Sequence, residues 1–352
     1  MKKIRLYLLF LLPATLVIGG CKKPNFAAQQ EADSQVLNVG DYIKNNFNFT
    51  ILTAALEKTG LMDSLNNPNG QYTVFAPEDA GFAIDSILSV ADLDQFSVDS
   101  LRFIIKNHIL QTKLFLSDIP IQLDNLYPNM NGLNLYISVN PNPGQTSWAV
   151  SGVQAQSVQT ATSTTPAWDI PLANGVIHIL GRPLKYYNGT VQAFLASRPE
   201  LSYCVAGLKK FNLWDSLGIA SPYTIVAPVN QAFIGNGITL DSIAAMDTSK
   251  IQSIVFGGYT AYPHHIFTTD PNMLNGTGAL IIDGGYSLGI GYEGFILTSP
   301  SGAALGPLKN NTNANDRYST PLNPGSTDYT CSNGVVHIIG QLMVLPSDVP
   351  KQ

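Results

Sequence analysis

The sequence predicts two copies of one globular domain, each built from both helices and strands. Two segments recur in the same order along the 352 residues: 72–82 returns at 223–233, and 169–179 returns at 328–338. Both separations are close to the size of a whole domain, whereas solenoid repeats recur every ~20 to 50 residues. The chain is therefore a tandem array, and its function is to be sought among proteins that use such arrays.

Helices are predicted early in each copy. Apolar residues recur at helical spacing over Phe49–Leu56, and Gly60 ends this pattern, as glycine commonly does after a helix. A second helix is expected at Ser97–Ile109, with its apolar residues on one face. Two short helices are also predicted, with Asp79 and Asn230 as their N-caps.

The recurring segments themselves are predicted strands. The first, at 72–75 and 223–226, stops at a proline, which cannot donate a hydrogen bond to a neighbouring strand. The second follows an Asn-Gly step in each copy. Further strands are expected at 133–139, 286–290 and 294–298.

A long polar segment precedes the last strand of each copy. Residues 156–168 are rich in Ser, Thr and Gln, and residues 308–327 are rich in Asn, Thr and Pro. Loops of this length inside a compact domain are either functional or disordered. Because these segments share a position but differ in sequence, we expect ligand contact there. The linker at 184–189 is so short that the two copies are expected to pack together.

The N-terminus predicts export and lipid anchoring. The apolar run Leu6–Ile18 follows basic residues and is too short for a bilayer-spanning helix of about 20 residues. The Gly-Gly-Cys step resembles a bacterial lipobox, so residues 1–21 are expected to be a signal that ends at a lipidated Cys21, and residues 22–35 a tether. An ordinary signal peptide is the alternative. The expected location is the bacterial cell envelope, lipid-anchored at the outer membrane, with its surface and periplasmic faces both open.

Charge argues against nucleic acid as a partner. The net charge is −5, and only 12% of the residues are charged, against about 25% in a typical domain. No Lys/Arg cluster occurs beyond the N-terminal signal, so the basic surface that nucleic-acid binding requires is missing from the sequence.

Two cysteines remain once Cys21 is assigned to the lipid anchor. Cys204 and Cys331 both occupy positions that hold leucine in the first copy. They are either two buried apolar residues or a disulfide, which an oxidising compartment would allow.

The recurring segments resemble the two signatures of fasciclin (FAS1) domains. The first is Thr-Val-Phe-Ala-Pro followed by a phenylalanine, and the second is Asn-Gly-Val-Ile-His. Both occur in order in both copies, with Ile-Val in place of Val-Phe in the second copy. The scaffold residues that this resemblance identifies are Thr73, Pro77, Phe82, Asn174, Gly175, His178, Thr224, Pro228, Phe233, Asn333, Gly334 and His337.

The resemblance implies an α+β fold of two tandem FAS1 domains, each a wedge-like β-sandwich flanked by short helices. The domains are expected at 36–184 and 185–347, followed by a tail at 348–352. The implied role is non-catalytic adhesion through protein or glycan ligands. The Tyr-His pair that some animal members use for integrin contact is absent at Asn107-His108, so integrin-type binding is not expected.

The histidines are interpreted as structural. His108, His178 and His337 lie in apolar patterns and are expected to hydrogen-bond the backbone. The adjacent pair His264-His265 would need a bent backbone and a third ligand to hold a metal. No metal site and no cofactor are therefore predicted.

No catalytic residues are predicted either. The Gly-x-Ser-x-Gly elbow of serine hydrolases is absent. Asp169 and Asp328 recur at one position and are interpreted as carboxylates that cap the Asn-Gly turn. The chain is expected not to be an enzyme, and a hydrolase is the least favoured reading.

Aromatic residues near the long polar segments are the predicted ligand contacts. Their apolar faces among amide side chains suit sugar rings, although such rings can also pin a loop to its domain. The alternative function is an accessory glycan-binding subunit of an outer-membrane uptake system. The predicted contacts are Trp148, Trp168, Tyr318 and Tyr329.

Overall fold

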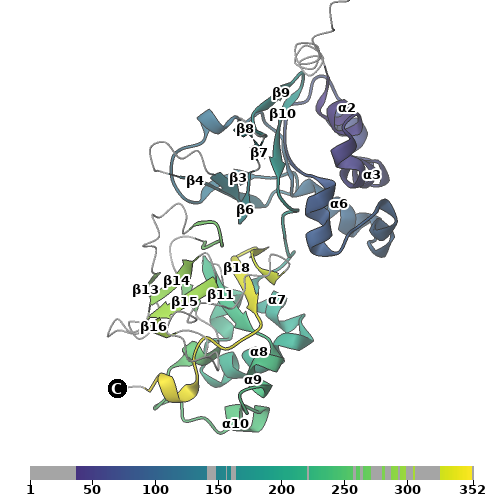
Figure 1. Ribbon diagram of the computed structural model, residues 1–352. Coiled ribbons are helices and arrows are strands. Elements are labelled where there is room, and N and C mark those ends of the chain that lie inside the picture. Colours follow the sequence, from purple (N-terminus) through teal and green to yellow (C-terminus); the bar gives the residue numbers. More distant parts are fainter. Residues whose placement is uncertain are drawn as a thin grey trace, which may run out of the picture.

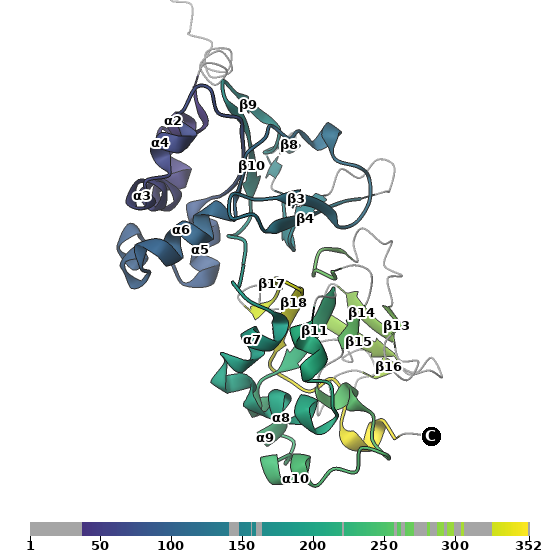
Figure 2. The same cartoon turned by 180° about the vertical axis from the view of Figure 1, so that it is seen from behind.

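The computed structural model describes residues 37–140, 148–155, 157–159, 164–219, 222–256, 259–261, 265–270, 280–281, 287–291, 294–298, 304–305 and 326–350 of the 352-residue chain. These residues form two halves, each with helices and strands, that follow one another along the chain (Figure 1). In each half the helices lie to one side of a central sheet and a second sheet lies to the other (Figures 1 and 2). The α+β fold class is confirmed.

Short helices cover one face of the first central sheet. The helix predicted before Gly60 ends there, and this glycine has the left-handed φ of 72° that favours glycine. The helix predicted at Ser97–Ile109 stops at Lys106, because Ile109 belongs to a strand. The helices are α2 (Val39–Lys44), α3 (Thr50–Thr59), α4 (Met62–Leu65), α5 (Asp79–Phe82) and α6 (Val98–Lys106), with 3-10 turns at Phe47–Phe49, Ala83–Asp85, Val90–Gln95 and Leu116–Asp118.

The central sheet of the first half contains both recurring segments as neighbours. Its strand order is β2 (Ile109–Leu110), β1 (Tyr72–Pro77), β10 (Gly175–Leu180) and β9 (Ile170–Leu172). β1 and β10 run parallel, in a register that sets Tyr72 opposite Gly175 and Pro77 opposite Leu180. The two edge strands are antiparallel to their neighbours.

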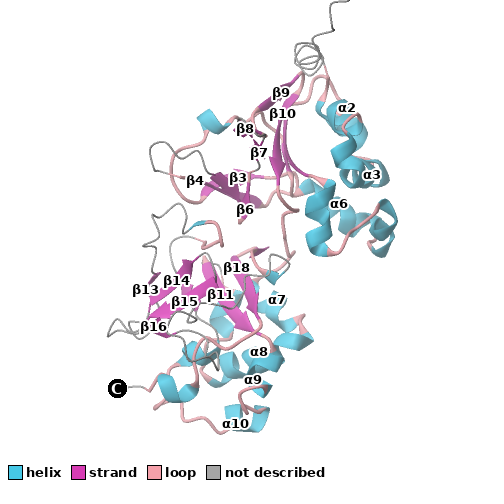
Figure 3. Cartoon of the chain, viewed as in Figure 1, coloured by secondary structure: helices cyan, strands magenta, loops and turns pink. Residues whose placement is uncertain are grey.

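Side chains of β1 and β10 alternate between two cores, as strand geometry requires. Val74 and Ile177 pack among the helices. Phe75 and Leu180 pack instead against the second sheet. The first half therefore has three layers, one of helices (cyan in Figure 3) and two of strands (magenta). The second sheet consists of β3 (Asn125–Pro128), β4 (Asn134–Val139), β5 (Trp148–Val150) and β6 (Val153–Gln154), and a separate pair is formed by β7 (Ser157–Gln159) and β8 (Thr164–Pro166).

The second half repeats the central sheet with the same order and register. β12 (Tyr259–Ala261), β11 (Tyr223–Pro228), β18 (Gly334–Ile339) and β17 (Tyr329–Cys331) are neighbours, and Tyr223 lies opposite Gly334. Its other elements are α7 (Val191–Ala196), α8 (Ser202–Lys210), α9 (Asn230–Ile234), α10 (Leu240–Ala244), the strands β13 (Leu280–Ile281), β14 (Ser287–Gly291), β15 (Gly294–Thr298) and β16 (Ala304–Leu305), and 3-10 turns at Pro199–Leu201, Asp215–Gly218, Ser253–Phe256 and Pro346–Asp348.

The Asn-Gly step before β10 joins three chain segments. The Oδ1 atom of Asn174 accepts a hydrogen bond from the Val39 N–H at 2.9 Å. Its Nδ2 atom donates to the carbonyls of Leu65 and Asn67 at 2.7 and 2.8 Å. A Cβ atom at Gly175 would lie 2.4 Å from a carbonyl oxygen of β1, so only glycine permits this close approach.

The second copy makes equivalent contacts. Asn333 accepts a hydrogen bond from the Val191 N–H at 2.8 Å and donates to the carbonyls of Leu217 and Ile219 at 2.9 and 2.6 Å. A Cβ atom at Gly334 would again lie 2.4 Å from a carbonyl oxygen of the parallel strand. The Asn-Gly step therefore fastens the start of each domain to its last strand.

The first recurring segment is also structural. Thr73 donates its hydroxyl to the Thr112 carbonyl at 2.7 Å and accepts from the Leu114 N–H at 2.9 Å. Thr224 accepts in the same way from the Ile266 N–H at 3.1 Å. Pro77 and Pro228 are the last residues of β1 and β11, and Phe82 and Phe233 are buried.

His178 and His337 are held by the backbone, as predicted. The Nε2 atom of His178 donates to the Leu114 carbonyl at 2.9 Å, and its Nδ1 atom accepts from the Asp169 N–H at 3.1 Å. His337 has the same two kinds of partner, at 2.8 and 3.2 Å. Both rings are neutral in this arrangement, because one nitrogen accepts while the other donates. Burial lowers the pKa of His178 to about 4.

Asp79 and Asn230 cap helices other than those predicted. The Asp79 carboxylate accepts from the N–H groups of Thr50 and Ile51 at 3.1 and 2.8 Å, which lie at the start of α3. Asn230 accepts from the Tyr203 N–H in α8 at 3.0 Å. The short helices α5 and α9 have no side-chain cap. The prediction was wrong because it considered only neighbours in sequence, and these caps bridge separate elements.

Asp169 and Asp328 do not cap the Asn-Gly turn, which corrects a second prediction. Asp169 accepts from the Leu116 N–H at 2.8 Å, and Asp328 accepts from the Thr268 N–H at 2.8 Å. Both aspartates have a left-handed φ, of 57° and 60°. Each carboxylate therefore holds a segment that is distant in sequence against the central sheet.

A buried ion pair joins the two halves. The Nη2 atom of Arg182 donates to Oδ2 of Asp328 at 2.6 Å, and the two side chains are 8% and 0% exposed. The Asp124 carboxylate accepts from both the backbone N–H and the ring Nδ1 of His265, at 2.8 and 3.0 Å. The His265 ring lies against Tyr136, with 3.9 Å between ring centroids. The halves thus pack together, as the short linker predicted.

Replacing Asn174 by leucine is expected to lower the free energy of unfolding by about 2–4 kcal/mol. The apolar side chain would leave buried backbone groups of three segments without partners. Urea unfolding followed by circular dichroism measures the change. The matched control is Asn69→Leu, at an exposed asparagine in the nearby turn. A decrease in the free energy of unfolding below about 1 kcal/mol would show that the Asn174 amide does not stabilise the fold.

Stability is expected to fall between pH 6.5 and pH 4. Burial lowers the pKa of His178 and of His108 to about 4, and it also lowers the pKa of His337. The unfolded chain binds these protons first, so the stabilisation is complete above about pH 6.5 and is lost as pH falls toward 4. His178→Gln keeps a donor and an acceptor without titrating. Urea titrations at several pH values give the slope of the free energy of unfolding against pH. In His178→Gln this slope should be smaller than in the wild type by the equivalent of about one proton. An unchanged slope would contradict a lowered pKa at His178.

Replacing Arg182 by leucine is expected to destabilise the protein by about 3–5 kcal/mol, because the buried Asp328 carboxylate would lose its counter-charge. The double variant Arg182→Leu/Asp328→Asn should recover part of that loss. Differential scanning calorimetry measures both. The control is Lys250→Leu, whose ion pair with Asp247 is exposed and should leave the midpoint unchanged. Equal losses of stability in Arg182→Leu and Lys250→Leu would show that the Arg182–Asp328 ion pair does not stabilise the junction of the halves.

Candidate functional site

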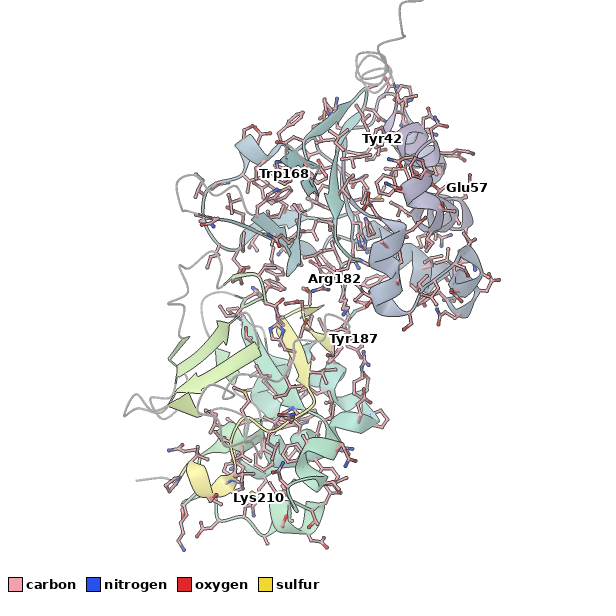
Figure 4. All side chains as sticks on the ribbon, in the orientation of Figure 1. Tyr42, Glu57, Trp168, Arg182, Tyr187 and Lys210 are labelled. Atoms are coloured by element: carbon pink, nitrogen blue, oxygen red, sulfur yellow. The ribbon has the colours of Figure 1, made fainter. Side chains whose placement is uncertain are left out.

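A cavity of about 670 Å³ lies where the two halves meet. Its walls come from α5, the following 3-10 turn and α6 in the first half, from the linker, and from α7 and β17 in the second half. Figure 4 labels Arg182 and Tyr187 at this junction. Because both halves contribute side chains, the cavity exists only when the halves are packed together.

The wall from the first half is mostly apolar, although Asp85 and Ser86 belong to it. Phe82, Ile87 and Leu101 are buried in the helical core, and they also border the cavity. Ile104 lines the cavity from α6, and Ile84, which is 41% exposed, lies at the cavity from the 3-10 turn after α5. This wall offers a ligand mainly apolar surface.

The wall from the linker and the second half carries two cations around one aromatic ring. The guanidinium carbon of Arg198 lies 4.9 Å from the ring centroid of Phe194 and 5.3 Å from that of Tyr329. The Nζ atom of Lys185 lies 5.1 Å from the same Tyr329 centroid and 3.4 Å from a carboxylate oxygen of Asp85. Such contacts stabilise a cation beside an aromatic face.

Burial changes the acidity of two of these groups. It lowers the pKa of Lys185 to about 8, with the Asp85 carboxylate acting in the opposite direction. It also raises the pKa of the Tyr329 hydroxyl. At pH 7 Lys185 is therefore mostly protonated, and Tyr329 is neutral.

The predicted ligand-contact aromatics have different surroundings. Trp148 is 1% exposed and packs against Phe75 and His178 in the core between the sheets, which corrects the expectation that it faces a ligand. Trp168 is partly buried and meets the edge of Trp148. Tyr329 lines the cavity. Tyr318 lies outside the described residues.

The described residues of the first long polar segment include two strands that were not predicted. Within 156–168, the strands β7 and β8 pair antiparallel. The prediction of strands relied on patterns of apolar residues. These two strands are mostly polar in sequence, so that method did not identify them. Of the second segment, 308–327, only 326 and 327 lie among the described residues.

Other chemistry is not assembled in the described part of the chain. Its residues contain no group of three His, Cys, Asp or Glu side chains placed to hold a metal ion. Cys204 and Cys331 are free, buried thiols rather than a disulfide. Among these same residues, no helix has the length and apolar character to cross a bilayer. His264 lies outside them.

Lys185 and Arg198 were not predicted from the sequence. Neither belongs to a motif, and one follows a core strand while the other follows a helix. The sequence offered one indication of these residues: basic residues are scarce, since the chain has only 19 Lys and Arg residues. Two of them near the join between the copies could have marked this region.

Comparison with known proteins supports the assignment of the fold. Residues 47–186 match the family model described as the fasciclin domain. The chain is similar to human periostin, with 24% identity over 308 residues that make up 87% of this chain and 31% of periostin. It is also similar to Fasciclin-1 of Drosophila melanogaster, with 27% identity over 212 residues, or 55% of this chain and 30% of that protein. The chain spans about a third of the length of these relatives.

A solved FAS1 domain pair from the insect cell adhesion molecule Fasciclin I covers 85% of this chain and 99% of its own, at 18% identity and a TM-score of 0.35. Within the chain itself, the second half repeats the central strand order and register of the region that matches the family model. Residues 47–186 are therefore similar to the fasciclin domain, the family that the recurring segments of the sequence resemble.

Proposed function

We propose that this chain is a non-catalytic binding protein of the bacterial cell envelope, in which two fasciclin-type halves contact a protein or glycan ligand. The observation that carries the proposal is the similarity of residues 47–186 to the fasciclin domain, together with the repetition of their central sheet in the second half. Adhesion is the role that the family resemblance implies. The packed junction would present both halves to a ligand as one surface.

The state of the histidines supports a non-catalytic role. His108 donates from Nδ1 to the Ile104 carbonyl and accepts at Nε2 from the Leu184 N–H, both at 2.9 Å. His178 and His337 likewise use both ring nitrogens on the backbone. A general base needs a free ring nitrogen within reach of its substrate, and these three rings have none.

Anchoring through a lipid at Cys21 belongs to the same proposal. Its support is the sequence pattern of a basic start, a short apolar run and a Gly-Gly-Cys step. Metabolic labelling with a palmitate analogue, lost in Cys21→Ser, tests the anchor. Protease treatment of intact cells then separates the outer-surface location from the periplasmic one.

Trp168→Ala is expected to lower ligand capture about tenfold, because a partly exposed indole face is a strong contact for a sugar ring or a protein side chain. The purified mature chain, immobilised on beads, is tested against solubilised envelope material, with protease or periodate treatment of that material to distinguish protein from glycan.

The matched control is Trp214→Ala, at another partly buried tryptophan, which lies in the second half beside Lys209. Equal capture by the wild-type and Trp168→Ala chains would exclude Trp168 as a contact. Co-purification with an outer-membrane transporter would favour the accessory-subunit alternative, and turnover of a model substrate would favour a hydrolase.

A further inference from the structure

The cavity between the halves has the size of a small-molecule site. Its volume of about 670 Å³ lies within the range of roughly 300–1,000 Å³ that such sites occupy. The adhesion surface proposed above does not require it. Its lining residues come from both halves, so a ligand here would contact the two domains at once.

The two sides of the cavity differ in chemistry. One side is apolar and includes Phe82, Phe96 and Ile104 from the first half. The other side has the cations Lys185 and Arg198. A ligand that complements both sides has an apolar body and an anionic end.

The geometry of the cations favours a carboxylate. Arg198 lies over two rings, of Phe194 and Tyr329, which orient its planar guanidinium. Guanidinium groups bind carboxylates through two parallel hydrogen bonds. Lys185 adds a second positive charge beside Tyr329, against one lining carboxylate, Asp85. The lining residues thus carry two cations and one carboxylate, and the Glu200 carboxylate, which is not among them, lies 3.4 Å from Arg198.

We propose that this cavity binds a small amphipathic carboxylate, such as a medium-chain fatty acid. The apolar chain would lie along the wall that includes Ile104, and the carboxylate would lie at Arg198 and Lys185. Tyr329 then serves as the aromatic support of an anion site rather than as a glycan contact.

Isothermal titration of the mature chain with three compounds that each have a ten-carbon chain tests the proposal. Decanoate, decanol and decyltrimethylammonium share the apolar body and differ in the charge of the head group. Decanoate is expected to bind at least about tenfold more tightly than decanol, and the ammonium compound should bind least. Equal affinities for all three would overturn the proposal.

Arg198→Gln is expected to weaken decanoate binding about tenfold and to leave decanol binding unchanged. The control is Arg102→Gln. The two arginine side chains are similarly exposed, at 37% for Arg102 and 35% for Arg198, and both are paired with an acid, but Arg102 does not line the cavity. Unchanged decanoate affinity in a folded Arg198→Gln protein would overturn the proposal.

A second variant keeps the test decisive if Arg198→Gln fails to fold. Ile104→Gln changes the apolar wall at a partly exposed position and should weaken decanoate and decanol alike. Decanoate binding that is unaffected by this variant would place the ligand elsewhere. Loss of envelope capture in Trp168→Ala with normal decanoate binding would show that the two sites are separate.

Discussion

The parallel pairing of β1 with β10, repeated by β11 with β18, is the constraint on which the rest of the structure depends. Each pair joins strands from opposite ends of a domain, so the whole intervening chain must return before the sheet can form. The Asn-Gly step makes this return specific. Its amide satisfies backbone groups of distant segments, and its glycine admits the neighbouring carbonyl. The helices and the second sheet then cover the two faces of that pair.

The two halves share one scaffold, and their junction uses contacts that only one copy makes. Asp169 and Asp328 occupy one position in the repeat and hold a distant segment in the same manner. Asp328 alone adds an ion pair with Arg182 across the junction. That contact is fully buried, so each half compensates a charge that the other would otherwise leave unpaired. The packed arrangement in turn brings the linker, α6, α7 and β17 around one cavity.

The candidate site was only partly accessible from the sequence. Tyr329 was predicted as a ligand contact and does line the cavity, whereas Trp148 lies in the core. Both residues are aromatic and lie near polar segments, so composition could not separate them. They differ in the direction in which the side chain extends from its strand, since the Trp148 side chain in β5 packs in the core against the central sheet. Lys185 and Arg198 carry no motif, and the packing of the linker and of α7 against β17 places them around Tyr329.

The sequence by itself determined the duplication, the α+β class, the main strands and the structural nature of His178 and His337. These follow from periodicity and from residue types that tolerate few backbone geometries. Tertiary structure alone decided the caps supplied by Asp79 and Asn230, the hairpin within 156–168 and the cavity at the junction. Those features depend on which distant segments meet. That is a property of packing in three dimensions, and local sequence patterns do not encode it.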